Sequence, residues 1–323
     1  MTRAALLLTL AACVQAPAAP GPHAIGYAVD AFTSDAGPLT LHLWYPADQC
    51  TTPMTFGHYV AGDESHFDGI RQVAMTACRD AAPLAGTHPV LIGRHEPGVW
   101  PVQAEHFAGH GYIVAMVASR GSRITATGDE RLRAIGANYE RQAREMQYAL
   151  AHVTAARQGD VTRVGVLASG AAPLLFAMQT PDVRAVSLQD AGVFGDGLTS
   201  MAVRTSSWWA PDRLRAPLTY FLTRAEAERE TRQADFDAIP ATPRLRQVLD
   251  VSGAPSHDDL SSARLLRSRT SDAPDNARDR AFHQVLDAQR RFFDAWLRSN
   301  TDALPRLPRL PVPDQRQRRL ASS

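Results

Sequence analysis

Short apolar runs that alternate with segments of helical periodicity restrict the fold of this chain more than any other feature. The runs are nearly continuous, as is typical of parallel strands that are buried on both faces. They lie at residues 90–92, 112–117, 163–167, 185–188, 218–222 and 247–251. Helical patterns occur between and after them, at residues 102–109, 137–156, 172–179 and 281–297. This order predicts an α/β fold with a mostly parallel, doubly wound sheet flanked by helices, whose ligands bind beyond the carboxyl ends of the strands.

The rest of the chain adds a hairpin and two tails. Residues 26–32 and 39–45 alternate between apolar and polar side chains around a turn, which predicts an opening β-hairpin. Residues 68–79 are expected to form a short helix, in a stretch without a clear strand pattern. A chain of 323 residues with 45% hydrophobic content can bury one large core. We therefore expect one domain over residues 23–300, after a leader at 1–22 and before a Pro- and Arg-rich, disordered tail at 301–323.

The leader has the features of an export signal. Arg3 precedes the apolar residues 4–10, and Leu10-Ala11-Ala12-Cys13 resembles the bacterial lipoprotein box, in which the cysteine is lipidated. The apolar segment is too short to span a bilayer. A plain secretory signal, cleaved further along at an alanine, is the alternative. Either signal predicts export to the cell envelope, and lipidation of Cys13 would anchor the protein to a membrane.

Two other cysteines, Cys50 and Cys78, remain after Cys13. In an oxidising compartment, two leftover cysteines favour one disulfide between them. The alternative is a pair of buried, unpaired thiols.

Charge and composition exclude several classes of function. All 34 basic residues are arginines, so mechanisms that need a Schiff-base lysine or a P-loop lysine are excluded. The net charge of +1, without a basic stripe, gives no reason to expect nucleic acid as a partner. The pair His95-Glu96 begins a zinc-protease motif, but Val99 stands where the second histidine belongs. We predict no metal and no cofactor.

The order of short motifs along residues 26–300 resembles α/β-hydrolases of the platelet-activating-factor acetylhydrolase and dienelactone hydrolase type. Each motif is weak alone, and the resemblance lies in their order and spacing. The motifs are Leu43-Trp44-Tyr45-Pro46, Pro89-Val90-Leu91-Ile92, His110-Gly111-Tyr112, Arg163-Val164-Gly165-Val166, Ser256-His257-Asp258-Asp259 and Phe292-Phe293-Asp294-Ala295-Trp296-Leu297. The resemblance implies hydrolysis of small carboxylic esters or lactones, by a serine, an acid and a histidine in that chain order.

The resemblance also suggests which residues would form that triad. His257 falls where the catalytic histidine of the family falls. Asp190 follows the strand after which acetylhydrolase-like members carry their acid, and Glu226 occupies the place that other α/β-hydrolases use. We favour Asp190 and keep Glu226 as the alternative. Ser169 is the provisional nucleophile.

The nucleophile turn departs from the family pattern. Serine hydrolases carry Gly-x-Ser-x-Gly at this turn, but here the order is Gly165-Val166-Leu167-Ala168-Ser169-Gly170, and counting from the strand puts Gly170 at the serine position. The turn requires a positive φ, which glycine adopts without cost. Ser169 then precedes the nucleophile position, with a side chain directed away from the triad. A slip of the strand by one residue would bring Ser169 into position, but it would exchange the packed faces of the strand.

The oxyanion hole departs from the pattern as well. Family members usually carry His-Gly after the third strand, and here His95 is followed by Glu96 and Pro97. Proline donates no N–H, and a carboxylate near a forming oxyanion would repel it. Two hypotheses follow. The protein is either an ester hydrolase with impaired or atypical activity, or a catalytically inactive, exported lipoprotein that binds a ligand or acts as a scaffold. The expected ligand is a small ester or lactone.

Overall fold

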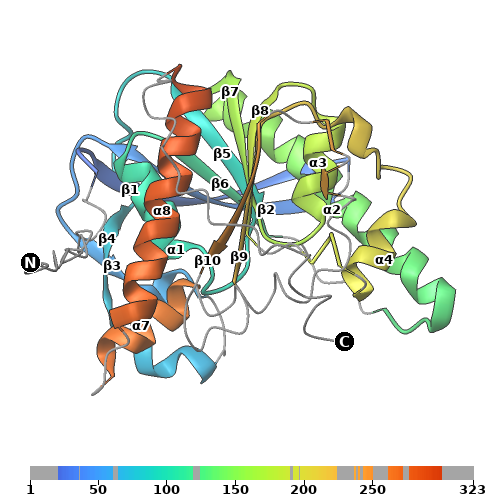
Figure 1. Ribbon diagram of the computed structural model, residues 1–323. Helices are drawn as coiled ribbons and strands as arrows, with labels where there is room; N and C mark the ends of the chain where they lie inside the picture. The colour runs from blue at the N-terminus through green and yellow to red at the C-terminus, as the bar shows by residue number, and fades with distance from the viewer. Residues whose placement is uncertain are drawn as a thin grey trace, which may run out of the picture.

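A ten-stranded sheet forms the centre of the protein in the computed structural model (Figure 1). The structure describes residues 21–35, 37–60, 65–118, 124–189, 192–195, 197–223, 236–237, 239–240, 243–249, 261–271 and 276–299. The strand order is β10-β9-β8-β7-β5-β6-β2-β1-β4-β3. The leader with Cys13 and the tail after residue 300 lie outside the described residues.

The six strands from β10 to β6 are parallel, as the continuous apolar runs predict. They are β5 (His88–Arg94), β6 (Ile113–Ala118), β7 (Gly159–Ala168), β8 (Val183–Gln189), β9 (Leu218–Thr223) and β10 (Arg244–Leu249). Leu91, Val166 and Leu222 are all at most 1% exposed. Because all six strands run in one direction, their carboxyl ends lie along the same edge of the sheet.

Two helical layers cover the sheet (Figure 1). One face carries α1 (Pro101–Gly109), α7 (Ser262–Thr270) and α8 (Asn276–Leu297), and the other carries α2 (Gly128–Ala156), α3 (Ala172–Gln179) and α4 (Leu198–Arg204). Phe292 and Phe293 of α8 are fully buried. Burial of one such side chain stabilises the fold by about 2 kcal/mol. The predicted helix at 172–179 is confirmed at both ends, whereas α2 begins nine residues before its predicted start at residue 137.

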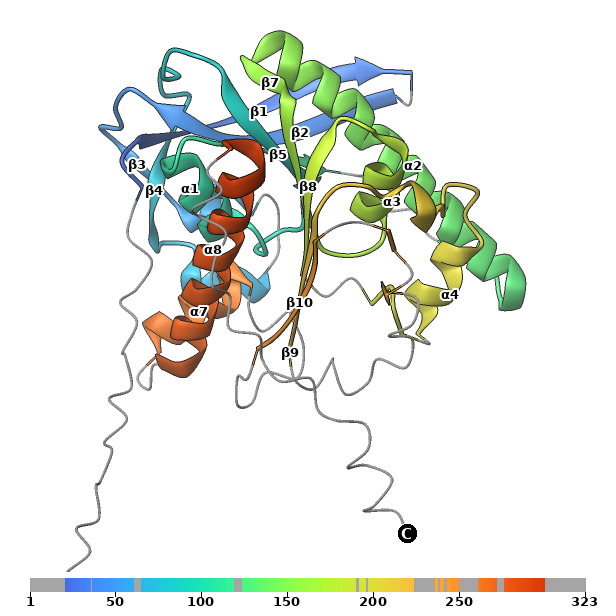
Figure 2. The same ribbon diagram turned by 45° about the horizontal axis from the view of Figure 1, so that its top comes forward.

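The predicted hairpin is formed by β1 (Ala24–Ser34) and β2 (Gly37–Ala47), and β2 also pairs with β6 in antiparallel fashion. Figure 2 shows the hairpin extending past the other strands toward α2. Two contacts hold it there. The Nε2–H group of His152 on α2 donates to the Asp30 carboxylate at 3.0 Å, and the His152 ring stacks on Phe32 with a centroid distance of 4.3 Å.

The prediction of a helix over residues 68–79 is wrong. This part of the chain forms the 3-10 turn η2 (Ser65–Ile70) and the strand β4 (Ala74–Arg79). Beside them lie β3 (Pro53–Thr55) and the turn η1 (Phe56–His58). Tertiary pairing explains the difference, because β4 pairs with β1 and β3 and buries alternate residues. The predicted disulfide between Cys50 and Cys78 is confirmed, with Cα atoms 5.4 Å apart, and it joins β4 to the segment that follows β2.

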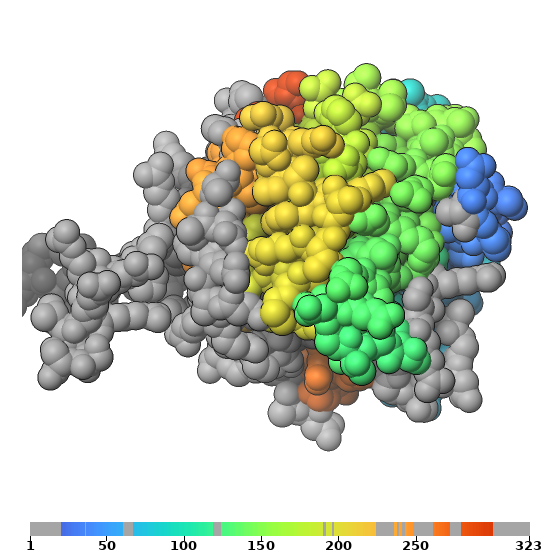
Figure 3. Space-filling model, turned by 90° about the vertical axis from the view of Figure 1, so that its right-hand side faces the viewer, coloured from blue at the N-terminus to red at the C-terminus, as the bar shows by residue number. Residues whose placement is uncertain are grey.

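The helix α4 and the residues that follow it lie against the first half of α2 (Figure 3). The Glu140 carboxylate on α2 accepts hydrogen bonds from the Ser206 hydroxyl at 2.8 Å and from the backbone N–H of Ser207 at 2.6 Å. The short turn η3 (Pro211–Arg213) then leads into β9. None of the described helices has the length and hydrophobicity that crossing a bilayer requires.

Candidate functional site

The candidate site lies at the carboxyl ends of β5 and β7, where two sequence-predicted pairs meet. Ser169 and Gly170 follow the last residue of β7, and His95 and Glu96 follow the last residue of β5. The two strands are neighbours in the sheet, and Ile92 pairs with Val166. Continuing this register by three residues brings His95 level with Ser169.

Gly170 is the residue that adopts the left-handed conformation at this turn. Its φ is +78°, whereas Ser169 has no positive φ. Among the described residues, a Cβ atom built on Gly170 would meet no heavy atom within 4 Å. The turn therefore has the backbone conformation and the open space of a nucleophile turn, and it presents a hydrogen atom where a serine hydrolase presents a hydroxymethyl group.

Ser169 continues the buried face that β7 shows to α1 and α8. Val166 and Ala168 pack in the core on the α2 and α3 side, while Leu167 packs in the core on the opposite side. Side chains alternate along a strand, so Ser169 falls on the side of Leu167. Ser169 is 5% exposed. Its hydroxyl makes no hydrogen bond to any residue within the described part of the chain.

His95 stacks on a second histidine that the sequence analysis did not single out. The rings of His95 and His42 lie 3.7 Å apart at an interplanar angle of 8°, and the Tyr27 hydroxyl is 2.7 Å from His42 Nδ1. Burial lowers the pKa of His42 to about 4 and that of His95 to about 3, and the neighbouring His42 contributes to the second shift. Both imidazoles are therefore neutral at pH 7. The signal for His42 in the sequence is a histidine between Leu41 and Leu43 on an alternating strand.

The loop after β5 has little capacity to stabilise an oxyanion. The backbone N–H of His95 donates to the Val117 carbonyl at 2.8 Å, so it is occupied within the sheet. The Glu96 carboxylate lies 4.0 Å from the Arg94 guanidinium, which offsets part of its charge. Pro97 has no N–H to donate. At the start of α3 the helix dipole places positive charge, although Pro173 in its first turn also has no N–H to donate.

Buried amides support the end of β8 from the opposite layer. Gln289 of α8 donates to the Ser187 hydroxyl at 3.0 Å, and Gln103 of α1 donates to the Gln189 side chain at 3.5 Å. Gln103 also donates to Gln289. These bonds fix the strand end directly before Asp190. The sequence analysis missed this group, because glutamines within helices carry no pattern that distinguishes buried from exposed positions.

The other predicted catalytic residues, Asp190, Glu226 and His257, lie outside the described residues. Within the described ranges, no group of three or more histidine, cysteine, aspartate or glutamate side chains is arranged to hold a metal ion.

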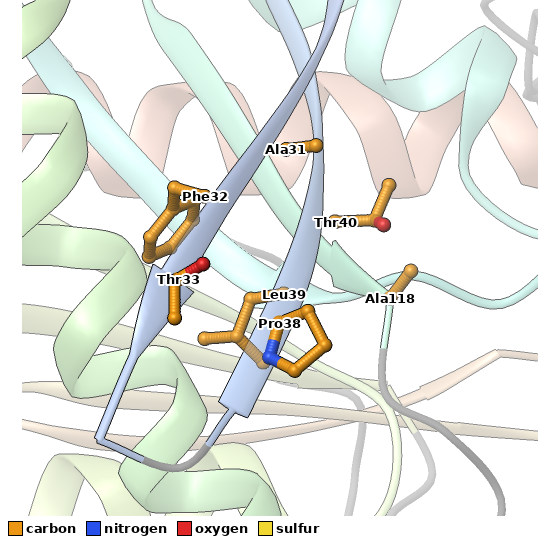
Figure 4. A pocket seen from close by; sticks show the side chains of 7 residues that line it. All are labelled: Ala31, Phe32, Thr33, Pro38, Leu39, Thr40 and Ala118. Carbon is orange, nitrogen blue, oxygen red and sulfur yellow. The ribbon is translucent and has the colours of Figure 1, made fainter.

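A pocket of about 220 Å³ lies at the tip of the β1–β2 hairpin, next to the carboxyl end of β6 (Figure 4). Ala31 and Thr33 of β1, Thr40 of β2 and Ala118 of β6 line it. A smaller pocket of about 70 Å³ lies among residues that include Tyr45, His88 and Arg157.

Comparison with known proteins shows a likeness of structure. No protein-family model matches the sequence, and no curated protein matches it. A ferulic acid esterase from Streptomyces cinnamoneus aligns with a TM-score of 0.60 and 19% identity, over 93% of this chain and 96% of that chain. The acylaminoacyl peptidase of Pyrococcus horikoshii aligns at 0.52 with 14% identity, over 85% of this chain and 42% of that chain. The protein m3DLH aligns at 0.51 with 13% identity, over 85% of this chain and 99% of that chain.

Proposed function

Because this chain has the α/β-hydrolase fold, with a glycine at the turn after β7, we propose that it binds small carboxylic esters or lactones without forming a serine acyl intermediate. The observation that carries this proposal is the conformation of Gly170, whose φ of +78° belongs to the residue at the apex of the turn. Covalent acyl transfer requires a hydroxyl at that apex. Ser169 precedes the apex and faces the α1 and α8 layer.

The magnitude of the expected loss is large. Removal of a triad serine lowers kcat by about 10⁶ and leaves about 10³ to 10⁴ over the reaction in water. That remainder comes from ligand binding and from the oxyanion hole. Here the N–H of His95 is bonded to Val117 and Glu96 stands beside the site, so the remainder shrinks further. Binding of a carbonyl compound, unlike acyl transfer, needs no nucleophile.

Open space above Gly170 supports a binding role. A ligand carbonyl can approach this backbone closely, since no heavy atom of the described ranges lies within 4 Å of a Cβ position there. The start of α3, at Ala172, directs its positive dipole end toward the same turn. A carbonyl oxygen, which carries partial negative charge, suits this environment.

A second candidate is slow ester hydrolysis by Ser169 itself. It is favoured by one observation, namely that the Ser169 hydroxyl makes no hydrogen bond within the described residues. One experiment separates the two functions. Hydrolysis of p-nitrophenyl acetate and binding of δ-valerolactone are measured for the wild type, for Ser169→Ala and for the control Ser271→Ala. The proposal expects saturable lactone binding in all three, and ester turnover that is equally low in all three. Multiple turnover that disappears only in Ser169→Ala would contradict it.

We further propose that the protein works outside the cytoplasm, tethered to a membrane through a lipidated Cys13. The disulfide between Cys50 and Cys78 supports export, because such bonds persist in oxidising compartments. Partition of the full chain between detergent and water after cell fractionation tests the tether. The wild type is expected in the detergent phase and Cys13→Ala in the aqueous phase, and equal partition of both would contradict a lipid at this residue.

A further inference from the structure

Four of the residues that line the pocket at the hairpin tip, namely Ala31, Thr33, Thr40 and Ala118, lie on one face of three neighbouring strands. Ala31 pairs with Thr40, and Thr40 pairs with Ala118, so these three side chains share a face of the sheet (Figure 4). Thr33 lies two residues beyond Ala31 and belongs to the same face. The pocket therefore has a floor that crosses from β1 through β2 to β6.

His42 continues this face directly. It lies two residues from Thr40 along β2 and pairs with Met116, which lies two residues from Ala118 along β6. Residues two apart on a strand are roughly 7 Å apart and point the same way. The pocket thus adjoins the stacked pair of His42 and His95.

His95 connects the pair to the turn after β7. It follows the end of β5, and continuing the register of β5 with β7 by three residues beyond its last pair, Ile92 with Val166, brings it level with Ser169. The sequence of groups along the edge is then Gly170 after β7, His95 after β5, His42 on β2, and the pocket. From β7 to β2 there are three strand spacings, which is about 14 Å.

The chemistry of the pocket selects an uncharged ring. Its lining residues carry no charge. Phe32, whose side chain alternates to the other face of the hairpin, packs against the main core, and its strand partner Leu39 is 5% exposed. A cavity of about 150 Å³ with apolar walls is large enough to hold benzene. The volume of about 220 Å³ therefore accommodates one ring with a small substituent. The hydroxyls of Thr33 and Thr40, which bond to no described residue, can accept or donate one hydrogen bond each to such a substituent.

The two histidines suit the segment between the pocket and the turn. The stacked rings of His95 and His42 form a flat surface against which an apolar linker can pack. Because both rings are neutral, they do not hold an ion at the place where the linker would lie.

We propose that the hairpin pocket holds an uncharged aromatic ring of a ligand whose carbonyl group lies at Gly170, with a linker that crosses His95 and His42. This inference rests on the proposed function, because it takes the turn after β7 as the carbonyl end of the ligand. The ligand class that it adds to the proposed function is an ester or lactone with an aromatic ring about 14 Å from the carbonyl group.

The test uses methyl ω-phenylalkanoates of increasing chain length, with methyl alkanoates of matched length that lack the ring. Binding is measured by calorimetry for the wild type, for the pocket-filling variants Ala31→Trp and Thr33→Trp, and for the control Val161→Trp. Val161 is 49% exposed and lies in the first half of β7, away from the pocket. Circular dichroism checks that each variant is folded.

The expected result has three parts. Affinity of the phenyl esters rises about tenfold or more over the matched plain esters once the chain spans about 14 Å. Both pocket variants remove this gain, and Val161→Trp keeps it. The affinity of short plain esters is the same in all four proteins.

Two other outcomes separate this inference from the proposed function. If plain esters bind but the phenyl group adds nothing, or its gain survives both pocket variants, the inference is overturned and the proposed function stands. If no ester binds, while phenol binds the wild type and neither pocket variant, the proposed function fails and with it the carbonyl end of the inferred ligand.

Discussion

The rings of His42 and His95 stack with their centroids 3.7 Å apart, which joins the second strand of the chain to the loop that follows β5. The two residues are far apart in the sequence, and in the sheet the strand β6 lies between β2 and β5. The pair is neutral in the folded protein because burial disfavours the imidazolium.

This stack predicts a pH dependence of stability. The pKa of His42 is lowered to about 4 on folding, from an ordinary value near 6.5. Between these values the unfolded chain binds the extra proton, so the contribution of His42 is complete above about pH 6.5 and is lost as the pH falls toward 4. In His42→Phe, which keeps an aromatic ring and cannot titrate, we expect urea unfolding to show a smaller loss of stability between pH 7 and pH 4.5. An equal loss in wild type and variant would show that His42 titrates alike in both states.

A second prediction concerns the buried carboxylate of Glu105. It accepts hydrogen bonds from the Tyr59 hydroxyl at 2.6 Å and from the backbone N–H groups of Thr76 and Ala77 at 3.0 Å each, and so ties α1 to the strand β4. In Glu105→Gln, an NH₂ group must face one of these donors, so we expect a loss of about 2 to 4 kcal/mol in the free energy of unfolding. The measurement is urea denaturation beside the control Glu140→Gln, whose carboxylate is bonded at the surface to the exposed Ser207 and to Ser206. If the free energy of unfolding falls no more in Glu105→Gln than in Glu140→Gln, the Glu105 carboxylate does not stabilise the contact between α1 and β4 as we expect.

Two glycines of the site differ in what they tolerate, and this gives a third prediction. At Gly170 a methyl group meets open space but a positive φ, whereas at Gly93 it would lie 2.5 Å from the Leu167 carbonyl oxygen and 2.8 Å from Met116 Sδ. We expect Gly170→Ala to cost about 1 to 2 kcal/mol, from backbone strain alone. Gly93→Ala should cost more, since β5 and β7 must separate. Thermal unfolding of both variants ranks them, and the reverse order would mean that the turn is more tightly packed than the open space at Gly170 indicates.

The sequence predicted the parallel part of the sheet well, because buried parallel strands contain uninterrupted apolar stretches such as residues 90–92 and 164–167. It also predicted the disulfide and the position of Gly170 at the turn. It failed at β4, where pairing with β1 and bonds from Glu105 decide the structure, and short local patterns do not carry such long-range contacts. His42 was missed for a similar reason, since a polar residue on an alternating strand is typical of a solvent-facing position. Gln189 was missed because it follows the apolar run at the very end of β8. The triad candidates Asp190, Glu226 and His257 stay predictions.

The account depends most on the residue at the apex of the turn after β7. Labelling with a fluorophosphonate probe, followed by mapping of the adduct by mass spectrometry, tests it directly on the wild type, on Gly170→Ser and on the control Gly170→Ala. Serine at residue 170 restores the missing hydroxyl at a Cβ position that has no heavy atom of the described part of the chain within 4 Å. A nucleophile raises kcat by about 10⁶, and an altered oxyanion hole lowers it by about 10³. We therefore expect ester turnover by Gly170→Ser to exceed that of the wild type by a factor on the order of 10³.

We expect no adduct on the wild type or on Gly170→Ala, and an adduct on residue 170 of Gly170→Ser. An adduct on Ser169 of the wild-type protein would contradict the account, because that serine would then be the working nucleophile.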